Sequence, residues 1–180
     1  MPAQPVQLVV DAEHFERVVE EGILQAHVSV DIMTADFKAL LVPKPGRRRA
    51  KSIVDAFRKL ADKGVEIRLL HAGVPSSAAL RELRKELPTG LTIRRCPRLH
   101  AKAVIVDSRA MYLGSANLTG AGLGAKSDGR RNFELGIWTE DTGLIDRVFA
   151  RFNALWEGHE CEACRRHDVC PEPLEEPDLS

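Results

Sequence analysis

The residues of this chain best suited to chemistry are concentrated in residues 100–117, HAKAVIVDSRAMYLGSAN. His100 and Lys102 are two positions apart and are followed by β-branched residues that favour a strand. Side chains alternate between the two faces of a strand, so we expect this imidazole and ammonium to share one face. Asp107 lies at an odd offset from His100, and we expect it on the opposite face, in a buttressing role or a salt bridge.

This set of groups can cleave a phosphodiester. A neutral imidazole such as that of His100 can attack phosphorus and form a phosphohistidine. The Lys102 ammonium and the Asn117 amide can hold the non-bridging oxygens in the transition state, so catalysis needs no metal or other cofactor. Gly114 begins a tight turn where backbone can approach a ligand, and Arg98 is predicted to bind substrate if the strand extends to it.

The pattern His100-x-Lys102-x4-Asp107-x6-Gly114-Ser115-x-Asn117 resembles the HKD signature of the phospholipase D superfamily, without a gap. The resemblance implies a metal-independent phosphodiesterase with His100, Lys102, Asp107, Ser115 and Asn117 in its active site. It also implies two such motifs, one histidine forming the covalent intermediate and the other acting as general acid. This chain has a single motif, because no other histidine is followed two residues later by lysine.

The smallest members of the superfamily carry one motif and pair as symmetric homodimers with the active site on the two-fold axis. The resemblance therefore predicts an obligate homodimer, in which the second His100 comes from the partner subunit. The family also tends to place a glutamate on a later strand, as acceptor for the other ring nitrogen of the nucleophile. Glu134 is similar in position, and a carboxylate there would fix the imidazole tautomer. Ser108 stands where many relatives have glycine, which we expect to change only the turn.

The size and composition fit one globular domain, since 44% of the 180 residues are hydrophobic. We assign residues 1–156 to a phospholipase D-like catalytic domain and residues 157–180 to an acidic, cysteine-rich tail. The tail carries eight acidic and two basic side chains, which leaves 24 basic and 18 acidic side chains in the body. Basic residues cluster in 44–59 and 94–98, although the first cluster is equally explained as a solvated face.

Helical and β periodicities alternate along the chain. They predict an α/β fold in which a mixed sheet is sandwiched between helices, with the active site at a homodimer interface. The expected strands are 7–10, 27–33, 65–70, 91–94, 100–106, 110–113 and 132–139. The expected helices begin after Asp11, at Ser52, at Ser76 or Ser77 and at Thr142, and Leu87 is expected on the apolar stripe of the third. Residues 36–46 are ambiguous.

The tail contains a second pattern, Cys161-x2-Cys164-x5-Cys170, and Cys96 is the remaining thiol of the chain. The spacing resembles that of RecB-type iron-sulfur nucleases, which implies a structural [4Fe-4S] cluster held by these four cysteines. Zinc is the competing interpretation, with Cys96, His159 or His167 as fourth ligand. In either case the metal would attach the tail to the body. The remaining alternative is a disordered acidic tail with incidental thiols.

Three functions remain open at this stage. The first is a nuclease, because the body of the chain is basic and suits a nucleic-acid substrate. DNA is favoured over RNA. The second is a phospholipase or phosphatidyltransferase acting on lipid head groups. The third is a non-catalytic nucleic-acid-binding module. No apolar run is long enough to span a membrane and no signal peptide is recognisable, so we expect a cytoplasmic protein without stable membrane association.

Overall fold

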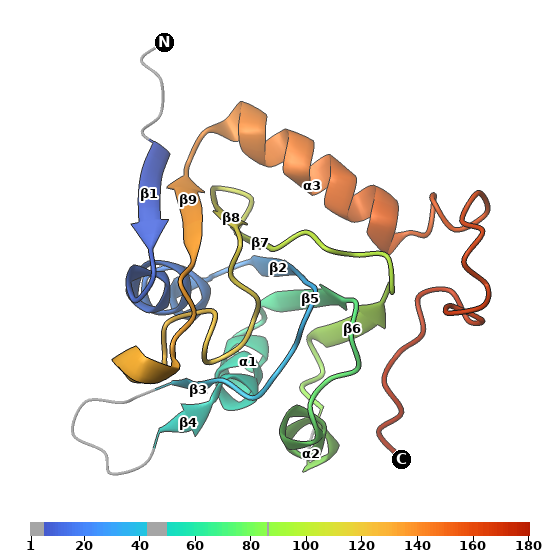
Figure 1. Ribbon diagram of the computed structural model, residues 1–180, viewed down its shortest axis with the longest axis horizontal. Helices are drawn as coiled ribbons and strands as arrows, with labels where there is room; N and C mark the ends of the chain where they lie inside the picture. Colours follow the sequence, from blue (N-terminus) through green and yellow to red (C-terminus); the bar gives the residue numbers. More distant parts are fainter. Residues whose placement is uncertain (1–5, 43–49, 86) are drawn as a thin grey trace.

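The architecture is a seven-stranded mixed sheet with helices on both faces, seen in a computed structural model that describes residues 6–42, 50–85 and 87–180 (Figure 1). The strand order is β1-β9-β8-β7-β2-β5-β6. Strands β2, β5 and β6 are parallel, and the other neighbours are antiparallel. The strands are β1 (Val6–Val10), β2 (Ser29–Thr34), β5 (Glu66–His71), β6 (Leu91–Arg95), β7 (Ala103–Val106), β8 (Ala110–Gly114) and β9 (Leu135–Thr139). A separate pair consists of β3 (Leu41–Val42) and β4 (Lys51–Ser52).

The two faces of the sheet bury different helices. On one face, α1 (Ile53–Ala61), α2 (Ser77–Lys85) and a π-helical segment (Phe15–Glu20) pack into the larger core. On the other, α3 (Thr142–Trp156) crosses the sheet and covers two smaller apolar clusters (Figure 1). Strand alternation explains the division, since Ile32 points into the first core and the adjacent Met33 into the second. The predicted sandwich of helices around a mixed sheet is confirmed.

Side-chain oxygens cap the helix at three of the four predicted starts. Ser52 Oγ accepts a hydrogen bond from the Val54 amide at 3.2 Å, and Ser76 Oγ does so from the Ala79 amide at 3.3 Å. Helix α3 begins at Thr142 as expected, and Asp141 caps it. Asp11 does not cap a helix, because its backbone is left-handed (φ 46°) and its carboxylate accepts the Glu134 amide instead.

Some element boundaries differ from the prediction. The motif strand begins at Ala103 rather than at residue 100, and β9 begins at Leu135 rather than at residue 132. Leu87 lies beyond α2 and is exposed. In the two strands the backbone just before the start bonds to a side chain instead: the His100 carbonyl accepts from Lys102 Nζ, and the Glu134 amide donates to Asp11. Part of the basic cluster in 44–59 falls in 43–49, outside the described residues.

The tail, residues 157–180, consists of turns and irregular backbone that lie against the body near β6 (Figure 1). Arg95 forms an ion pair with Glu175, and the Arg95 amide donates to the Glu175 carbonyl at 2.9 Å. Leu174 packs against the cluster that contains Phe152 and Trp156. Among the described helices, none is long and apolar enough to cross a bilayer.

Two buried histidines make stability depend on pH. Burial lowers the pKa of His14 and of His71, and for His71 the nearby Arg95 adds to the effect. In the unfolded chain both titrate near about 6.5, so below that pH the unfolded state binds more protons than the folded state. We expect the free energy of unfolding to fall as pH drops from about 6.5, by up to about 1.4 kcal/mol per pH unit for each histidine that stays neutral.

Denaturant melts at a series of pH values would measure this slope. His71→Asn is the matched variant, because the Asn amide can still donate to the Gly73 carbonyl, which His71 Nδ1 reaches at 2.7 Å, but cannot titrate. The variant should show a shallower loss of stability below pH 6.5. Equal slopes in the two proteins would contradict the assignment of His71 as a buried neutral group.

Candidate active site

With the exception of Asp107, the motif residues lie along one edge of the sheet, where β2 and β8 end and β7 and β9 begin. Lys102 Nζ lies 3.1 Å from His100 Nε2 and 3.2 Å from Nδ1, and donates to the His100 carbonyl at 2.8 Å. The expected pairing of imidazole and ammonium is therefore present, although both residues precede β7. The His100 side chain is exposed, whereas Lys102 is only 8% exposed.

The surroundings of Lys102 are unusual for a buried cation. Within the described residues its ammonium contacts only the ring and carbonyl of His100, and no carboxylate lies within ion-pair distance. A buried charge without a counter-ion is costly unless an anion completes the site. At this edge of the sheet the Lys102 ammonium therefore offers a positive charge, uncompensated among the described residues, to an anionic group beside His100.

The side-chain amide of Asn117 is fixed by hydrogen bonds to its oxygen, Oδ1. Its Oδ1 accepts hydrogen bonds from the Ala35 amide at 3.0 Å and the Asp36 amide at 3.1 Å, just past the end of β2. Thr34 completes the contact, since its Oγ1 accepts the Leu118 amide at 2.9 Å. With Oδ1 fixed in this way, the amide nitrogen is the end that can donate to a phosphate oxygen.

Ser115 and Glu134 form a hydrogen-bonded pair at the same edge. Ser115 Oγ donates to Glu134 Oε2, and Asn132 Nδ2 donates to Glu134 Oε1 at 3.0 Å. The Glu134 amide in turn donates to Asp11 Oδ1 at 2.8 Å. The expected hydrogen bond from His100 to Glu134 is not made within the described chain, where the Glu134 carboxylate accepts from Ser115 and Asn132.

A buried network beneath the turn was missed by sequence reasoning. The Ala116 amide donates to Tyr112 Oη at 3.0 Å, and Tyr112 Oη lies 3.0 Å from His14 Nε2. His14 Nδ1 donates to the Asp11 carbonyl at 2.9 Å. Burial raises the pKa of Tyr112 to about 12, so its hydroxyl stays protonated and can donate to His14. The sequence signal was a polar aromatic residue inside an apolar strand, which requires a hydrogen-bond partner.

Packing around Tyr112 requires glycine at position 114. A Cβ on Gly114 would overlap Tyr112 Oη and would lie 2.6 Å from Gly136 Cα. Gly136, its partner in the β8–β9 ladder, is restricted by the same tyrosine ring. The two glycines let Tyr112 lie under the turn that carries Ser115. The predicted contact of Gly114 with substrate stays a prediction, since packing is enough to explain the glycine.

Asp107 lies at the far end of β7 from His100. Its carboxylate accepts hydrogen bonds from three consecutive amides, those of His27, Val28 and Ser29, at 2.7–3.2 Å. Although partial burial acts to raise it, these bonds hold the pKa of Asp107 below its ordinary value. The carboxylate thus fixes the entry of β2 against β7, which is a buttressing position and not one that reaches the reacting phosphate.

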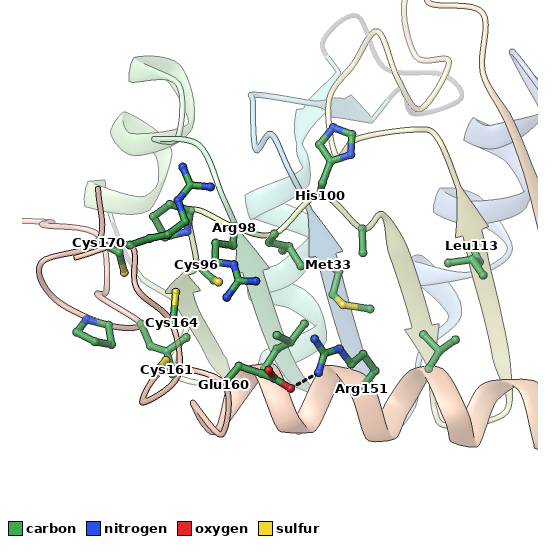
Figure 2. Close-up of a pocket in the computed structure, with 18 of the residues that line it drawn as sticks. Met33, Cys96, Arg98, His100, Leu113, Arg151, Glu160, Cys161, Cys164 and Cys170 are labelled. Atoms are coloured by element: carbon green, nitrogen blue, oxygen red, sulfur yellow. Dashed lines mark hydrogen bonds and ion pairs between the residues drawn. The ribbon is translucent and has the colours of Figure 1, made fainter. Parts of the chain in front are cut away.

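Arg98 does not share the face of His100, because residues 96–102 form an irregular segment between β6 and β7. Its guanidinium donates a hydrogen bond to Cys164. Figure 2 shows Arg98 directed towards the cysteines and the His100 ring directed away from them. The strand that would have placed Arg98 on the face of His100 does not extend to it, and its substrate-binding role stays a prediction.

The four cysteines line one cavity of about 570 Å³ between α3, the tail and the segment that carries His100 (Figure 2). The hydrogen bond from Arg98 lowers the pKa of Cys164, while burial and the neighbouring thiols raise the pKa values of Cys161 and Cys170. Among the described residues, no three cysteine, histidine or carboxylate side chains are already placed to hold a metal ion. All four thiols are free.

Comparison with known proteins decides the family. The sequence profile described as "Cardiolipin synthase, PLD-like domain" matches residues 19–156, more than half of the chain. The chain belongs to the phospholipase D-like family. The expected relationship is confirmed, and no curated protein shows significant similarity to the whole sequence.

Solved structures share this phospholipase D-like fold at low sequence identity. NucT from Helicobacter pylori superposes with a TM-score of 0.64 at 17% identity, covering 86% of this chain and 96% of NucT. Nuc from Salmonella typhimurium, a phospholipase D family member, gives 0.62 at 20% identity, covering 86% and 95%. A phosphatidylserine synthase from Haemophilus influenzae gives 0.54 at 16% identity, covering 83% of this chain but 38% of the synthase. The chain therefore spans nearly all of the small relatives and has a phospholipase D-like phosphodiesterase fold.

Proposed function

We propose that this protein is a metal-independent nuclease that cleaves DNA through a phosphohistidine intermediate in a homodimer. The observation that carries the proposal is the buried Lys102 ammonium beside an exposed imidazole, with no carboxylate partner in the described chain. A phosphodiester supplies the missing anion and places phosphorus next to the nucleophile. The Asn117 amide nitrogen can hold a second non-bridging oxygen.

The reaction divides into two steps. One His100 attacks phosphorus, a nitrogen–phosphorus bond forms, and the leaving oxygen takes a proton from His100 of the partner subunit. That second imidazole then removes a proton from water, which attacks the phosphohistidine and restores the first imidazole. The role of Glu134 as acceptor for the nucleophile stays a prediction, since its carboxylate is bonded to Ser115 and Asn132.

The need for a second copy has support at the sheet edge next to the site. Leu8 on β1 and Leu135 on β9 are 66% and 59% exposed, and Phe133 is 97% exposed. Leu135 follows Glu134 directly, so this apolar edge continues into the motif residues. Uncovered apolar side chains beside a site that holds one of two required histidines fit an isologous interface.

Leu8→Lys should therefore give a monomer that has lost nicking activity while remaining folded. The exposed side chain of Leu8 makes little contribution to the core, whereas two lysines facing each other across a two-fold axis would repel. Light scattering would report the mass and circular dichroism the fold. Val28→Lys is the matched control, because Val28 is 65% exposed at the opposite end of the sheet. An active monomer would contradict the proposed dimer.

The substrate class is tested by offering three phosphodiesters to the wild-type protein in EDTA. Supercoiled plasmid DNA should be nicked, and a structured RNA should be cut more slowly. Phosphatidylglycerol vesicles should stay intact. Vesicle hydrolysis without nicking would favour the lipid alternative, for which the likeness to a phosphatidylserine synthase is the available support. DNA binding without cleavage would favour the non-catalytic module. The cytoplasmic location stays a prediction.

A further inference from the structure

The tail packs against the body with its three cysteines on the side that faces Cys96. Arg94 Nη1 donates to the Trp156 carbonyl at 2.7 Å, where α3 ends, and the Arg95–Glu175 contacts hold the other end of the tail on β6. Between these two anchors the chain reverses at Gly158 (φ 77°), where a Cβ would lie 3.2 Å from Leu174 Cδ1 and 3.4 Å from Cys161 Sγ. The part of the tail that carries the cysteines is therefore looped back onto the body.

Cys96 lies at the point where this loop meets the body. It directly follows β6, and its amide donates to the His71 carbonyl at 2.8 Å, which fixes its backbone. Together with the three tail cysteines it lines the cavity of about 570 Å³ (Figure 2). Three cysteines from the tail and Cys96 from the motif segment thus face one space, although Cys96 is 65 or more residues away from the other three in sequence.

The position of the histidines separates the possible fourth ligands. His167 lines the same cavity, whereas His159 is absent from its lining and lies 3.2 Å from the Glu157 carboxylate, both side chains being exposed. Because His167 is exposed whereas all four cysteines are partly buried, the structure favours Cys96 with the three tail cysteines, and it leaves His159 outside the site. His159 is then a suitable control position.

The charges around the cavity suit a cluster of thiolates. Arg98, Arg147, Arg151 and Arg166 line it, and Arg98 donates directly to Cys164. The acidic residue in the lining is Glu160, whose carboxylate is paired with Arg151. Four thiolates bound to a divalent ion or to a [4Fe-4S] cluster leave a net negative charge, which guanidinium groups stabilise.

We propose that Cys96, Cys161, Cys164 and Cys170 form one tetrathiolate metal site that ties the tail to the segment bearing His100. The described thiols do not yet converge to bonding distance, so binding must draw the irregular tail inward. Each cysteine loses its proton to solvent as its sulfur–metal bond forms, and the free energy of binding orders the tail. The site is structural, and it stands whether or not the protein is a nuclease.

The full-length protein, purified without oxygen, should contain either one zinc or four iron and four sulfide per chain. Sulfur-to-iron charge-transfer absorption would identify the cluster, and a colourless protein containing zinc would identify the simple ion. Cys96→Ser should weaken metal binding by more than the roughly 10–100-fold expected for losing an outer-shell partner. His159→Ala should leave metal content unchanged. Retention of metal by Cys96→Ser, or metal-free protein that cannot be loaded with Zn²⁺ or with iron and sulfide, would overturn the proposal.

Alkylation of the wild-type protein gives a test that does not depend on variant folding. With metal bound, all four thiols should be protected from iodoacetamide, and removal of the metal should expose them together. Thiols that react equally before and after chelation would overturn the proposal, as would a disulfide between any two of them. None of these readouts uses phosphodiester cleavage, so failure of the proposed nuclease activity would be seen separately.

Discussion

His100→Ala should abolish nicking of plasmid DNA, with a loss of at least about 10⁴-fold, because the same side chain serves as nucleophile in one subunit and general acid in the other. The exposed ring contacts only Lys102 within the described residues, so its removal should leave folding intact. The covalent link between protein and DNA, trapped by denaturing a reaction in progress, should disappear in the variant.

Mixed dimers sharpen this prediction. If both imidazoles of a dimer are required, a preparation assembled from equal amounts of wild-type and His100→Ala subunits should retain about one quarter of the wild-type activity rather than one half. His159→Ala is the matched control, because that histidine is exposed on the tail and should leave the rate unchanged. Full turnover in His100→Ala, or activity proportional to the wild-type fraction, would contradict the mechanism.

Lys102→Met is the second large effect, and it separates catalysis from stability. Loss of the ammonium that stabilises the charge on phosphorus should lower kcat by about 10²–10³-fold. The free energy of unfolding should stay the same or rise, because an apolar side chain of similar length replaces a buried cation that has no carboxylate partner among the described residues. Single-turnover nicking and denaturant melts on the same preparations would measure both quantities.

Lys85→Met provides the comparison for this variant. Lys85 is exposed on α2 and paired with Glu82, so its loss should change neither the rate nor, by more than about 0.5 kcal/mol, the stability. If Lys102→Met instead unfolds the protein, the ammonium has a structural partner and the argument for a prepared anion site fails. An unchanged kcat would exclude Lys102 from the transition state.

The prediction from sequence was most reliable where chemistry and periodicity are local. The spacing of His100 and Lys102 was sufficient to predict their contact, and the apolar–polar alternation in 27–33 was sufficient to predict a strand, although β2 is buried on both faces. The prediction failed where a side chain, rather than another backbone group, is the hydrogen-bond partner of the backbone. Asp11 was expected to cap a helix, yet it accepts the Glu134 amide from a segment more than 120 residues away. Local patterns do not record such pairings.

The sequence by itself determined the family, through the residue types and spacing of one motif, and the α/β class, through the alternation of helix and strand periods. Only the tertiary structure decided what each group faces. It placed Arg98 against Cys164 rather than beside His100, used Asp107 to fix the entry of β2, and brought Cys96 into one cavity with the tail cysteines. The physical reason is that the burial of a side chain and the compensation of its charge depend on contacts between segments distant in sequence.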